Sequence, residues 1–134
     1  MLKPLFVIGV WGGKMADYEF SMPYPPSVNG YWRSFQGRQI ISKRGREYRE
    51  SAANAIRLLG LTNKLVSQRL SVSVVINPPT LRKYDIDNWC KGPFDALTHA
   101  GFWVDDEQVD SLLISKGEKV KGGRIDLKIN IIDL

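Results

Sequence analysis

Four aspartates and one lysine have the residue types and the spacing of a metal-binding site. Asp85 and Asp87 are separated by one residue, and residues 105–106 are again both aspartates. In an extended segment residues i and i+2 point to the same side, so we expect Asp85 and Asp87 to project together while Ile86 turns into the core. Neighbouring carboxylates repel each other unless a cation neutralises them, and Mg²⁺ prefers oxygen ligands. The pattern predicts a cation site that Asp106 completes if the intervening helix folds back.

Other roles fit the same residues. Asp87 could cap a helix, and residues 105–106 could form a polar turn. Lys91 lies four residues after Asp87, which suits either an ordinary i,i+4 ion pair or a cation that stabilises charge beside a reacting phosphate. His99 and Cys90 have no partners at zinc-ligand spacing, so we expect a surface or helix-end histidine and a packed cysteine.

The charge pattern sets these carboxylates apart from an otherwise basic chain. The net charge is +5, yet residues 85–110 hold seven of the fourteen acidic residues and one basic residue. A solvated acidic face explains this, and so does a cation site within a phosphate-binding surface. Twelve of the eighteen remaining basic residues form three groups, and all twelve except Arg49 are candidate DNA-binding residues. The groups are Arg33, Arg38, Lys43, Arg44, Arg46 and Arg49, then Arg82 and Lys83, then Lys116, Lys119, Lys121 and Arg124.

Two of these groups have alternative interpretations. Lysines near an exposed strand edge also deter aggregation, which would account for the last group. Tyr31, Trp32 and Phe35 are interleaved with the first group and could stack on exposed bases. They could equally be core or dimer contacts, which is the more ordinary role for such aromatics.

Two helices are expected to position the candidate site. Ser42 is a plausible N-cap for a helix that runs to about Leu59 and ends at Gly60. A second helix is expected over about residues 88–100, closed by Gly101. Pro93 lies deep for a helix and is expected to kink its first turns.

Strands are expected over residues 18–22, 69–77, 109–116 and 124–132, the last two joined as a hairpin by a turn at residues 122–123. Residues 27–39 are expected to form a loop. The predicted order is β-α-β-α-β-β, which gives a single domain of the α/β class (mixed α+β) with a small mixed sheet and two main helices.

Length and composition fit that architecture. A chain of 134 residues with 43% hydrophobic residues suits one packed domain, and one cysteine excludes a disulfide framework within the chain. No apolar run reaches the roughly 18 residues of a membrane span. We expect residues 1–14 to be a poorly ordered N-terminal extension, with Met15 as an alternative start, and residues 15–134 to be the domain. The alternative is an added edge strand over residues 5–10.

The order of residues around the aspartates is more distinctive than their spacing. The central run is Asp85-Ile86-Asp87-Asn88, then Lys91, then Phe94 to Thr98, then Ala100 to Val109. Matching outer segments are Pro23 to Ser27 with Asn29, Gly45 to Arg49 and Lys121 to Arg124. Over residues 18–132 the chain resembles the RusA family of Holliday-junction resolvases.

The resemblance implies a homodimer that cuts four-way DNA junctions by two symmetric nicks, with Mg²⁺ or Mn²⁺ and no small-molecule cofactor. The family's essential carboxylates match Asp85, Asp87 and Asp106, and its catalytic lysine matches Lys91. Asp105 matches an adjacent acidic position that we take as a supporting metal ligand. The ends left would be 5′-phosphate and 3′-hydroxyl. The implied setting is the cytoplasm, for a bacterial or phage-encoded protein that is nucleoid-associated when bound to DNA.

Two positions depart from the family pattern. Tyr84 stands where the family often has an arginine, and Gly92-Pro93 replaces ordinary helix formers close to Lys91. The first departure concerns local phosphate contacts and the second concerns the position of the lysine. The alternative functions are a broader branched-DNA nuclease, a catalytically silent DNA-binding protein on the same scaffold, and an acidic-patch interaction module.

Overall fold

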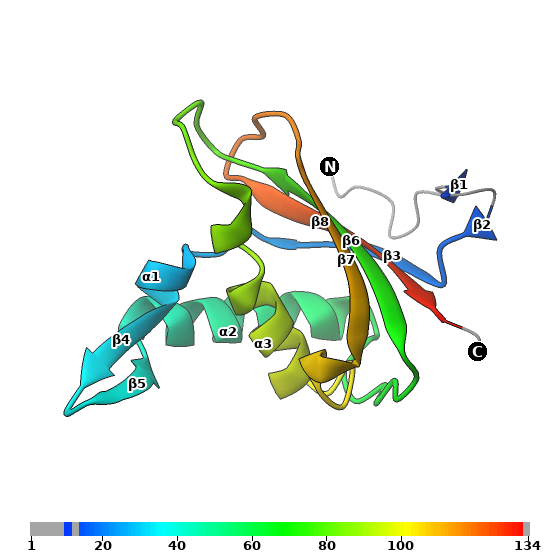
Figure 1. The fold of residues 1–134 in the computed structure, drawn as a ribbon, viewed down its shortest axis with the longest axis horizontal. Coiled ribbons are helices and arrows are strands. Elements are labelled where there is room, and N and C mark those ends of the chain that lie inside the picture. Colours follow the sequence, from blue (N-terminus) through cyan, green and yellow to red (C-terminus); the bar gives the residue numbers. More distant parts are fainter. Residues whose placement is uncertain (1–9, 12–13, 133–134) are drawn as a thin grey trace.

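The centre of the fold is a four-stranded sheet with helices packed on one face (Figure 1). The computed structural model describes residues 10–11 and 14–132. The strands are β3 (Tyr18–Pro23), β6 (Leu70–Asn77), β7 (Val109–Lys116) and β8 (Arg124–Ile131). Their order is β3-β8-β6-β7, with β8 antiparallel to both neighbours and β7 parallel to β6. The predicted mixed α+β class with a small mixed sheet is confirmed.

The predicted hairpin between the last two strands is wrong, because β6 lies between β7 and β8. The connection crosses the end of the sheet instead. The amide of Gly117 donates to the carbonyl of Ile76 at 2.7 Å, and the amide of Val120 donates to Pro78 at 2.9 Å. The turn at residues 122–123 is present, with positive φ at both glycines. It therefore joins two strands that are not neighbours.

Helix α2 (Lys43–Leu58) begins where the sequence predicts. The Ser42 hydroxyl accepts a hydrogen bond from the Gly45 amide at 2.9 Å, which caps the helix. Tyr48, Ala52 and Ile56 form its buried face against the core. Gly45 lies against the backbone of Tyr31, where an added Cβ would stand 2.5 Å from the carbonyl oxygen. Only a glycine lets the chain before α2 approach this closely.

Helix α3 (Lys91–His99) is shorter than predicted, because residues 86–88 form a separate 3₁₀ turn, η1 (Ile86–Asn88). The later start places Pro93 in the first turn of α3, where a helix loses no internal hydrogen bond to a proline. The expected kink was therefore based on a helix that began too early. Gly101 ends the helix with a φ of +75°, as predicted.

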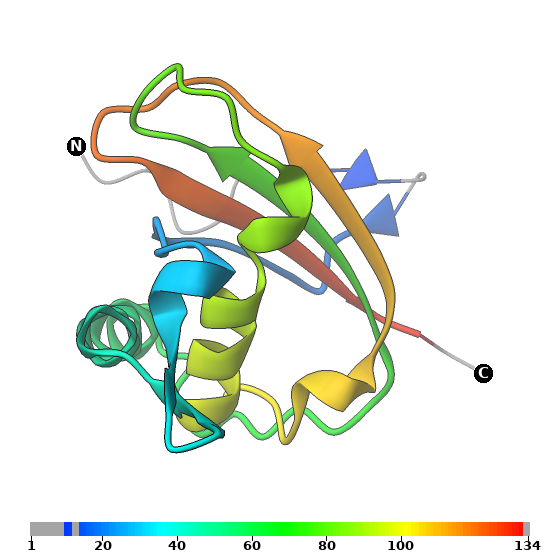
Figure 2. The ribbon, with the colours of Figure 1, turned by 60° about the vertical axis from the view of Figure 1, so that its left-hand side comes forward.

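Residues 27–39 are not the loop that we predicted. They contain α1 (Val28–Tyr31), β4 (Trp32–Phe35) and the start of β5 (Arg38–Ile41), with β4 and β5 paired as a hairpin. Tyr31 is fully buried and anchors the segment. Figure 2 shows α1 and the hairpin beside α3 and away from the main sheet. The elements are too short for their periodicity to be read from the sequence.

The expectations about the N-terminus fall largely outside the described residues. Two-residue strands β1 (Val10–Trp11) and β2 (Lys14–Met15) pair with each other. The predicted poor order of residues 1–14 and the alternative strand over residues 5–10 stay predictions. Within the described part of the chain, no helix combines the length and apolar character needed to cross a membrane.

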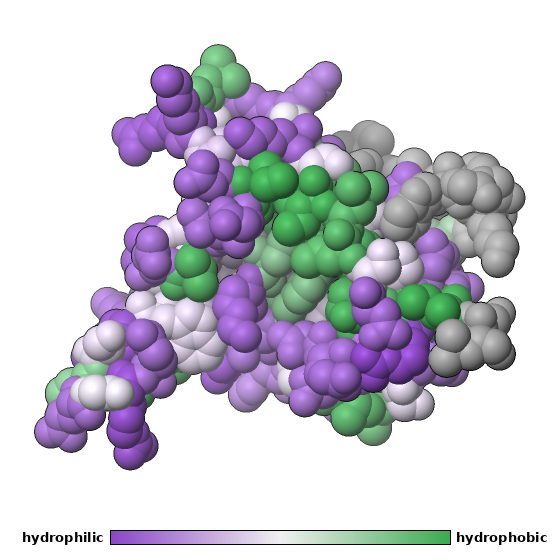
Figure 3. Space-filling view, viewed as in Figure 1, coloured by the Kyte–Doolittle hydropathy of each residue, from purple (hydrophilic) through white to green (hydrophobic). Residues whose placement is uncertain are grey.

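The core fills the space between the sheet and the helices. Alternate residues of β6 and β8 are buried, as predicted: Leu70, Val72, Val74 and Ile76, with Ile125, Leu127 and Ile129. Strand β7 lies at the edge of the sheet, and Leu112 and Leu113 on it are 42% and 52% exposed. Figure 3 shows apolar residues gathered at the surface over this part of the sheet.

Candidate active site

The four aspartates and Lys91 all belong to the crossover that joins the parallel strands β6 and β7. Asp85 and Asp87 are exposed and lie at η1. Asp85 has an extended backbone and precedes the turn, and its side chain makes no capping bond. Ile86 is 37% exposed, so the expectation that it turns into the core is wrong. The reason is the 3₁₀ turn, which replaces the extended alternation on which the expectation rested.

Asp105 and Asp106 lie at the start of a second 3₁₀ turn, η2 (Asp106–Gln108). The Asp105 carboxylate accepts the Glu107 amide at 3.0 Å, so it does cap a polar turn. This hydrogen bond, with a second from Asp106, lowers the pKa of Asp105. Burial and the hydrogen bond shared with Asp105 raise the pKa of Asp106, against a smaller opposite effect of Lys91. The two adjacent carboxyl groups therefore shift each other's pKa in opposite directions, which is typical of carboxylates that a cation can neutralise.

The donor chemistry of this cluster fits a hard divalent cation, since its candidate ligands are all carboxylate oxygens. The positions of these carboxylates do not yet form a complete metal site. Among residues 14–132, no three His, Cys, Asp or Glu side chains are gathered closely enough to form a ready-made metal site. The structure thus brings Asp105 and Asp106 together near Lys91, and it does not bring Asp85 and Asp87 into the same group.

Lys91 is the first residue of α3 and its side chain is exposed. Its charge acts on both carboxyl groups of the η2 pair: it adds to the lowering of the Asp105 pKa and opposes the raising of the Asp106 pKa. The i,i+4 ion pair with Asp87 does not occur among the described ion pairs, because Asp87 lies in η1 and Lys91 begins a different helix. The charge of Lys91 therefore interacts with Asp105 and Asp106 of η2.

Asp95, one turn after Lys91 on α3, is held by other partners. The guanidinium of Arg49 donates to its Oδ2 at 2.8 Å, and the buried Tyr31 hydroxyl donates to the same oxygen. Burial, followed by this hydrogen bond, raises the pKa of Tyr31. Arg49 is thus a structural residue of α2, in contrast to its exposed basic neighbours. The arrangement pairs Asp95 with Arg49 and Tyr31 rather than with Lys91.

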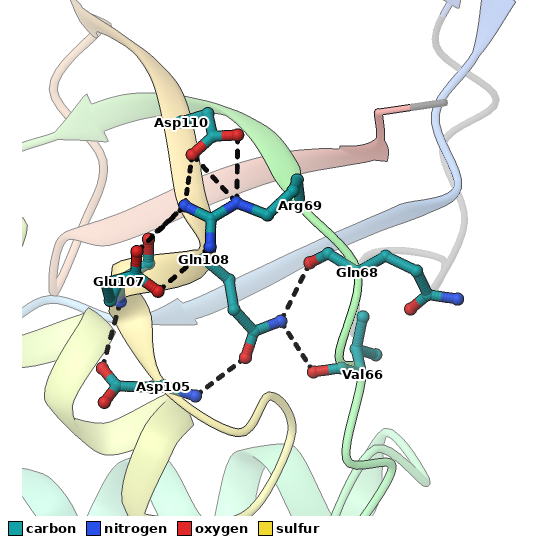
Figure 4. Close-up of polar contacts among 7 residues, drawn as sticks. All are labelled: Val66, Gln68, Arg69, Asp105, Glu107, Gln108 and Asp110. Atoms are coloured by element: carbon teal, nitrogen blue, oxygen red, sulfur yellow. Dashed lines mark hydrogen bonds and ion pairs between the residues drawn. The ribbon is translucent and has the colours of Figure 1, made fainter. Parts of the chain in front are cut away.

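Two residues that the sequence analysis did not single out position the η2 turn (Figure 4). The buried Gln108 side chain accepts the Asp105 amide at 2.8 Å and donates to the carbonyls of Val66 and Gln68 at 2.8 and 2.9 Å. Arg69 forms ion pairs with Glu107, at 3.0 Å, and with Asp110. Asp105 and Gln108 have the spacing of a capping box, which is a local signal for Gln108 that the sequence analysis missed. No local pattern marks Arg69, since its partners lie about forty positions away.

The basic groups lie on two sides of η1 and the start of α3 (Figures 1 and 2). Arg33 and Arg38 are exposed on the β4–β5 hairpin, and Lys43, Arg44 and Arg46 are exposed at the start of α2. On the other side, the loops 78–85 and 117–123 carry the exposed Arg82, Lys83, Lys119 and Lys121. Lys116 lies over the Tyr84 ring at 4.6 Å, and Arg124 pairs with Asp126 at 3.0 Å. Most of the candidate DNA-binding residues are therefore accessible.

The cysteine, the histidine and the three aromatic residues considered in the sequence analysis differ in how far they are buried. Cys90 is buried, which raises the pKa of its thiol to about 11, and His99 is exposed near the end of α3, as expected. Tyr31 belongs to the core, Trp32 is half-buried, and Phe35 is 50% exposed beneath the Arg33 guanidinium at 5.4 Å. The three aromatics thus have three different environments.

Comparison with known proteins gives one consistent result. The family model described as endodeoxyribonuclease RusA matches residues 23–131. The chain is 42% identical over 119 residues to the crossover junction endodeoxyribonuclease RusA of Enterobacteria phage HK97, covering 89% of this chain and 98% of that protein. It is 39% identical over 115 residues to the enzyme of the same name from Escherichia coli K12, covering 86% of this chain and 95% of that protein. The range that the family model matches spans the whole crossover between β6 and β7.

Proposed function

Because this chain belongs to the RusA family of endodeoxyribonucleases, we propose that it resolves four-way DNA junctions by paired symmetric nicks in recombination and repair. One observation in the structure supports the proposal above the others. Asp105 and Asp106 lie side by side at the start of η2, where the charge of Lys91 acts on both, in the same crossover that carries Asp85 and Asp87. Such a cluster, flanked by accessible basic side chains, suits cleavage of a phosphodiester. The proposed setting is the bacterial cytoplasm, at the nucleoid.

The chain's own residues would divide the work as follows. Asp85, Asp87 and Asp106 would hold Mg²⁺, or Mn²⁺ in its place, with Asp105 in support. The bound ion would supply the positive charge that activates water and neutralises the leaving oxygen. Lys91 would stabilise negative charge on the phosphate in the transition state. The basic side chains on the two sides of the site would fix the DNA backbone. Cleavage would leave 5′-phosphate and 3′-hydroxyl ends.

The proposed active unit is a homodimer, since a two-fold junction needs two cutting sites. A two-fold axis would place two identical centres on the two strands to be cut. The exposed edge strand β7, with Leu112 and Leu113, is the surface that we propose for the contact.

The test is a nicking assay on a synthetic four-way junction and a matched linear duplex, with Mg²⁺ or with EDTA. We expect the wild type to cut only the junction and only with metal, and Asp87→Asn to bind it without cutting. Asp87 is exposed, so its substitution should leave the fold intact. Glu50→Gln, an exposed change on α2, is the matched control and should cut normally.

A silent DNA-binding protein on the same scaffold is the second candidate. It is favoured by one observation, the lack of a ready-made group of three metal ligands within residues 14–132. The same assay separates the two functions. Junction binding without any cutting, in Mg²⁺ and in Mn²⁺, would establish the silent protein and reject the nuclease.

A further inference from the structure

A pocket of about 840 Å³ opens beside Lys91, on the side of the α1 segment and the β4–β5 hairpin. Its wall includes Asn29, Trp32, Arg33, Ser34, Gln39 and Lys91. The volume is in the range of small-ligand sites. Since Lys91 belongs both to this wall and to the proposed catalytic centre, a ligand here would lie next to the phosphate that is cut.

The walls of the pocket combine one flat apolar surface with hydrogen-bonding groups. Trp32 is half-buried and packs against the core, with its ring 5.1 Å from that of Tyr31 in an edge contact. Tyr31 is fixed in turn by its hydrogen bond to Asp95. The indole is therefore held in place before any ligand arrives, which lowers the entropic cost of stacking on it.

The polar groups surround that indole. Asn29 and Gln39 are exposed amides with both donors and acceptors, and amides of this kind can pair with the edge of a base. Arg33 and Lys91 are exposed cations. A fixed aromatic face, amides that can read an edge and flanking cations together suit a nucleobase attached to its phosphates.

We propose that this pocket receives one unpaired base of the DNA next to the scissile phosphate, with Trp32 as the stacking surface and Gln39 and Asn29 reading the base edge. The inference rests on the proposed junction-cutting function. A linear duplex keeps its bases stacked and paired, whereas the exchange point of a junction offers bases that separate at lower cost. The pocket would thus contribute both to junction selectivity and to base preference at the cut.

The test uses binding without metal, so that it does not depend on catalysis. All proteins carry Asp87→Asn, and the junctions contain an abasic site opposite one base at the exchange point, which leaves that base unpaired. We expect the unpaired base to tighten binding of the parent protein about ten-fold, because the unpairing cost is removed. Trp32→Leu should lose most of this gain. Phe35→Leu, an exposed aromatic on the same hairpin outside the pocket wall, should keep it.

A second pair of variants covers the case in which Trp32→Leu fails to fold. Gln39 is exposed, so Gln39→Ala should fold normally. This pair is made in the wild-type chain, with Asp87 intact and Mg²⁺ present, and sequencing the cut ends of junctions with randomised exchange points should show a flattened base preference for Gln39→Ala. Gln68→Ala, at an exposed position two residues before β6, should keep the wild-type preference. The pocket proposal would be overturned, and junction cutting would stand, if two results were found together. The unpaired base would tighten binding equally in all variants, and the base preference at the cut would be unchanged. A parent protein without preference for the junction over the duplex would overturn both.

Discussion

At the scale of single residues, the ion pair between Arg49 and Asp95 removes Asp95 as an ion-pair partner for Lys91. Lys91 and Asp95 lie one turn apart on α3, a spacing at which they could pair with each other. The Arg49 guanidinium, 26% exposed, and the Tyr31 hydroxyl hold Asp95 instead. The two side chains on α2 and α1 therefore act on the proposed catalytic lysine without touching it.

Replacing Arg49 should affect both stability and cutting. Arg49→Met removes a charge-assisted hydrogen bond to a partly buried carboxylate and should cost about 1–3 kcal/mol of unfolding free energy, measured by urea denaturation. The released Asp95 should then pair with Lys91 and slow the nicking of junctions. Arg57→Met, an exposed change on the same helix, is the control. The double variant Arg49→Met/Asp95→Asn should recover part of the nicking rate, and a rate as low as that of Arg49→Met would contradict the explanation.

Sequence reasoning proposed the residues of the candidate site from their types and spacing, and the structure differs from the geometry expected for Ile86, which lies between two of them. Asp85, Asp87, Asp106 and Lys91 are chemically conspicuous because carboxylates and a lysine recur at short spacing. The direction of Ile86 was wrong because a single 3₁₀ turn changes which way successive side chains point. Arg69 could not be found, since its role depends on contacts that only the folded chain brings together. The capping-box spacing of Asp105 and Gln108 could have marked Gln108, but not its hydrogen bonds to Val66 and Gln68.

At the scale of elements, the η2 turn depends on one buried side chain. Gln108→Leu keeps the volume but leaves the Asp105 amide and the carbonyls of Val66 and Gln68 without this partner. We expect a loss of about 2–3 kcal/mol of unfolding free energy, because buried polar groups without partners are costly. Calorimetry should show the lower melting temperature.

The matched control for that prediction is Gln68→Leu. Gln68 is exposed, and its side chain accepts a hydrogen bond only from the neighbouring Ser67 amide among the described contacts. It should leave the melting temperature nearly unchanged. Equal melting temperatures for the two variants would show that Gln108 does not hold the turn.

The elements themselves were predictable where a periodic pattern was long enough. Helix α2 and strands β6, β7 and β8 lie within a few residues of their predicted limits, because each has a clear cap or a clear alternation. The hairpin between β7 and β8 was wrong for a different reason. Which strands become neighbours is decided by packing across the whole sheet, and β6 takes the place between them.

At the scale of the whole molecule, the edge strand β7 leaves apolar side chains accessible. If two copies meet there, Leu112→Lys should convert the dimer into a monomer in sedimentation experiments, since a buried lysine without a partner is unfavourable. Paired nicks in one junction should then become independent single nicks. Leu58→Lys, at a 78% exposed site on α2, is the control and should remain dimeric. A Leu112→Lys protein that still sediments as a dimer would place the contact elsewhere.

The position of β8 also has a consequence for how the protein is made. β8 follows every other described strand in the chain, yet it lies inside the sheet and joins β3 to β6. Until the ribosome has released residues 124–131, β3 has no partner in that sheet and the core beneath it stays open. Pairings between such distant segments close slowly. The crossover that carries the proposed catalytic aspartates can therefore become rigid only after synthesis has passed β8, so we expect unfinished chains not to cut the DNA around them.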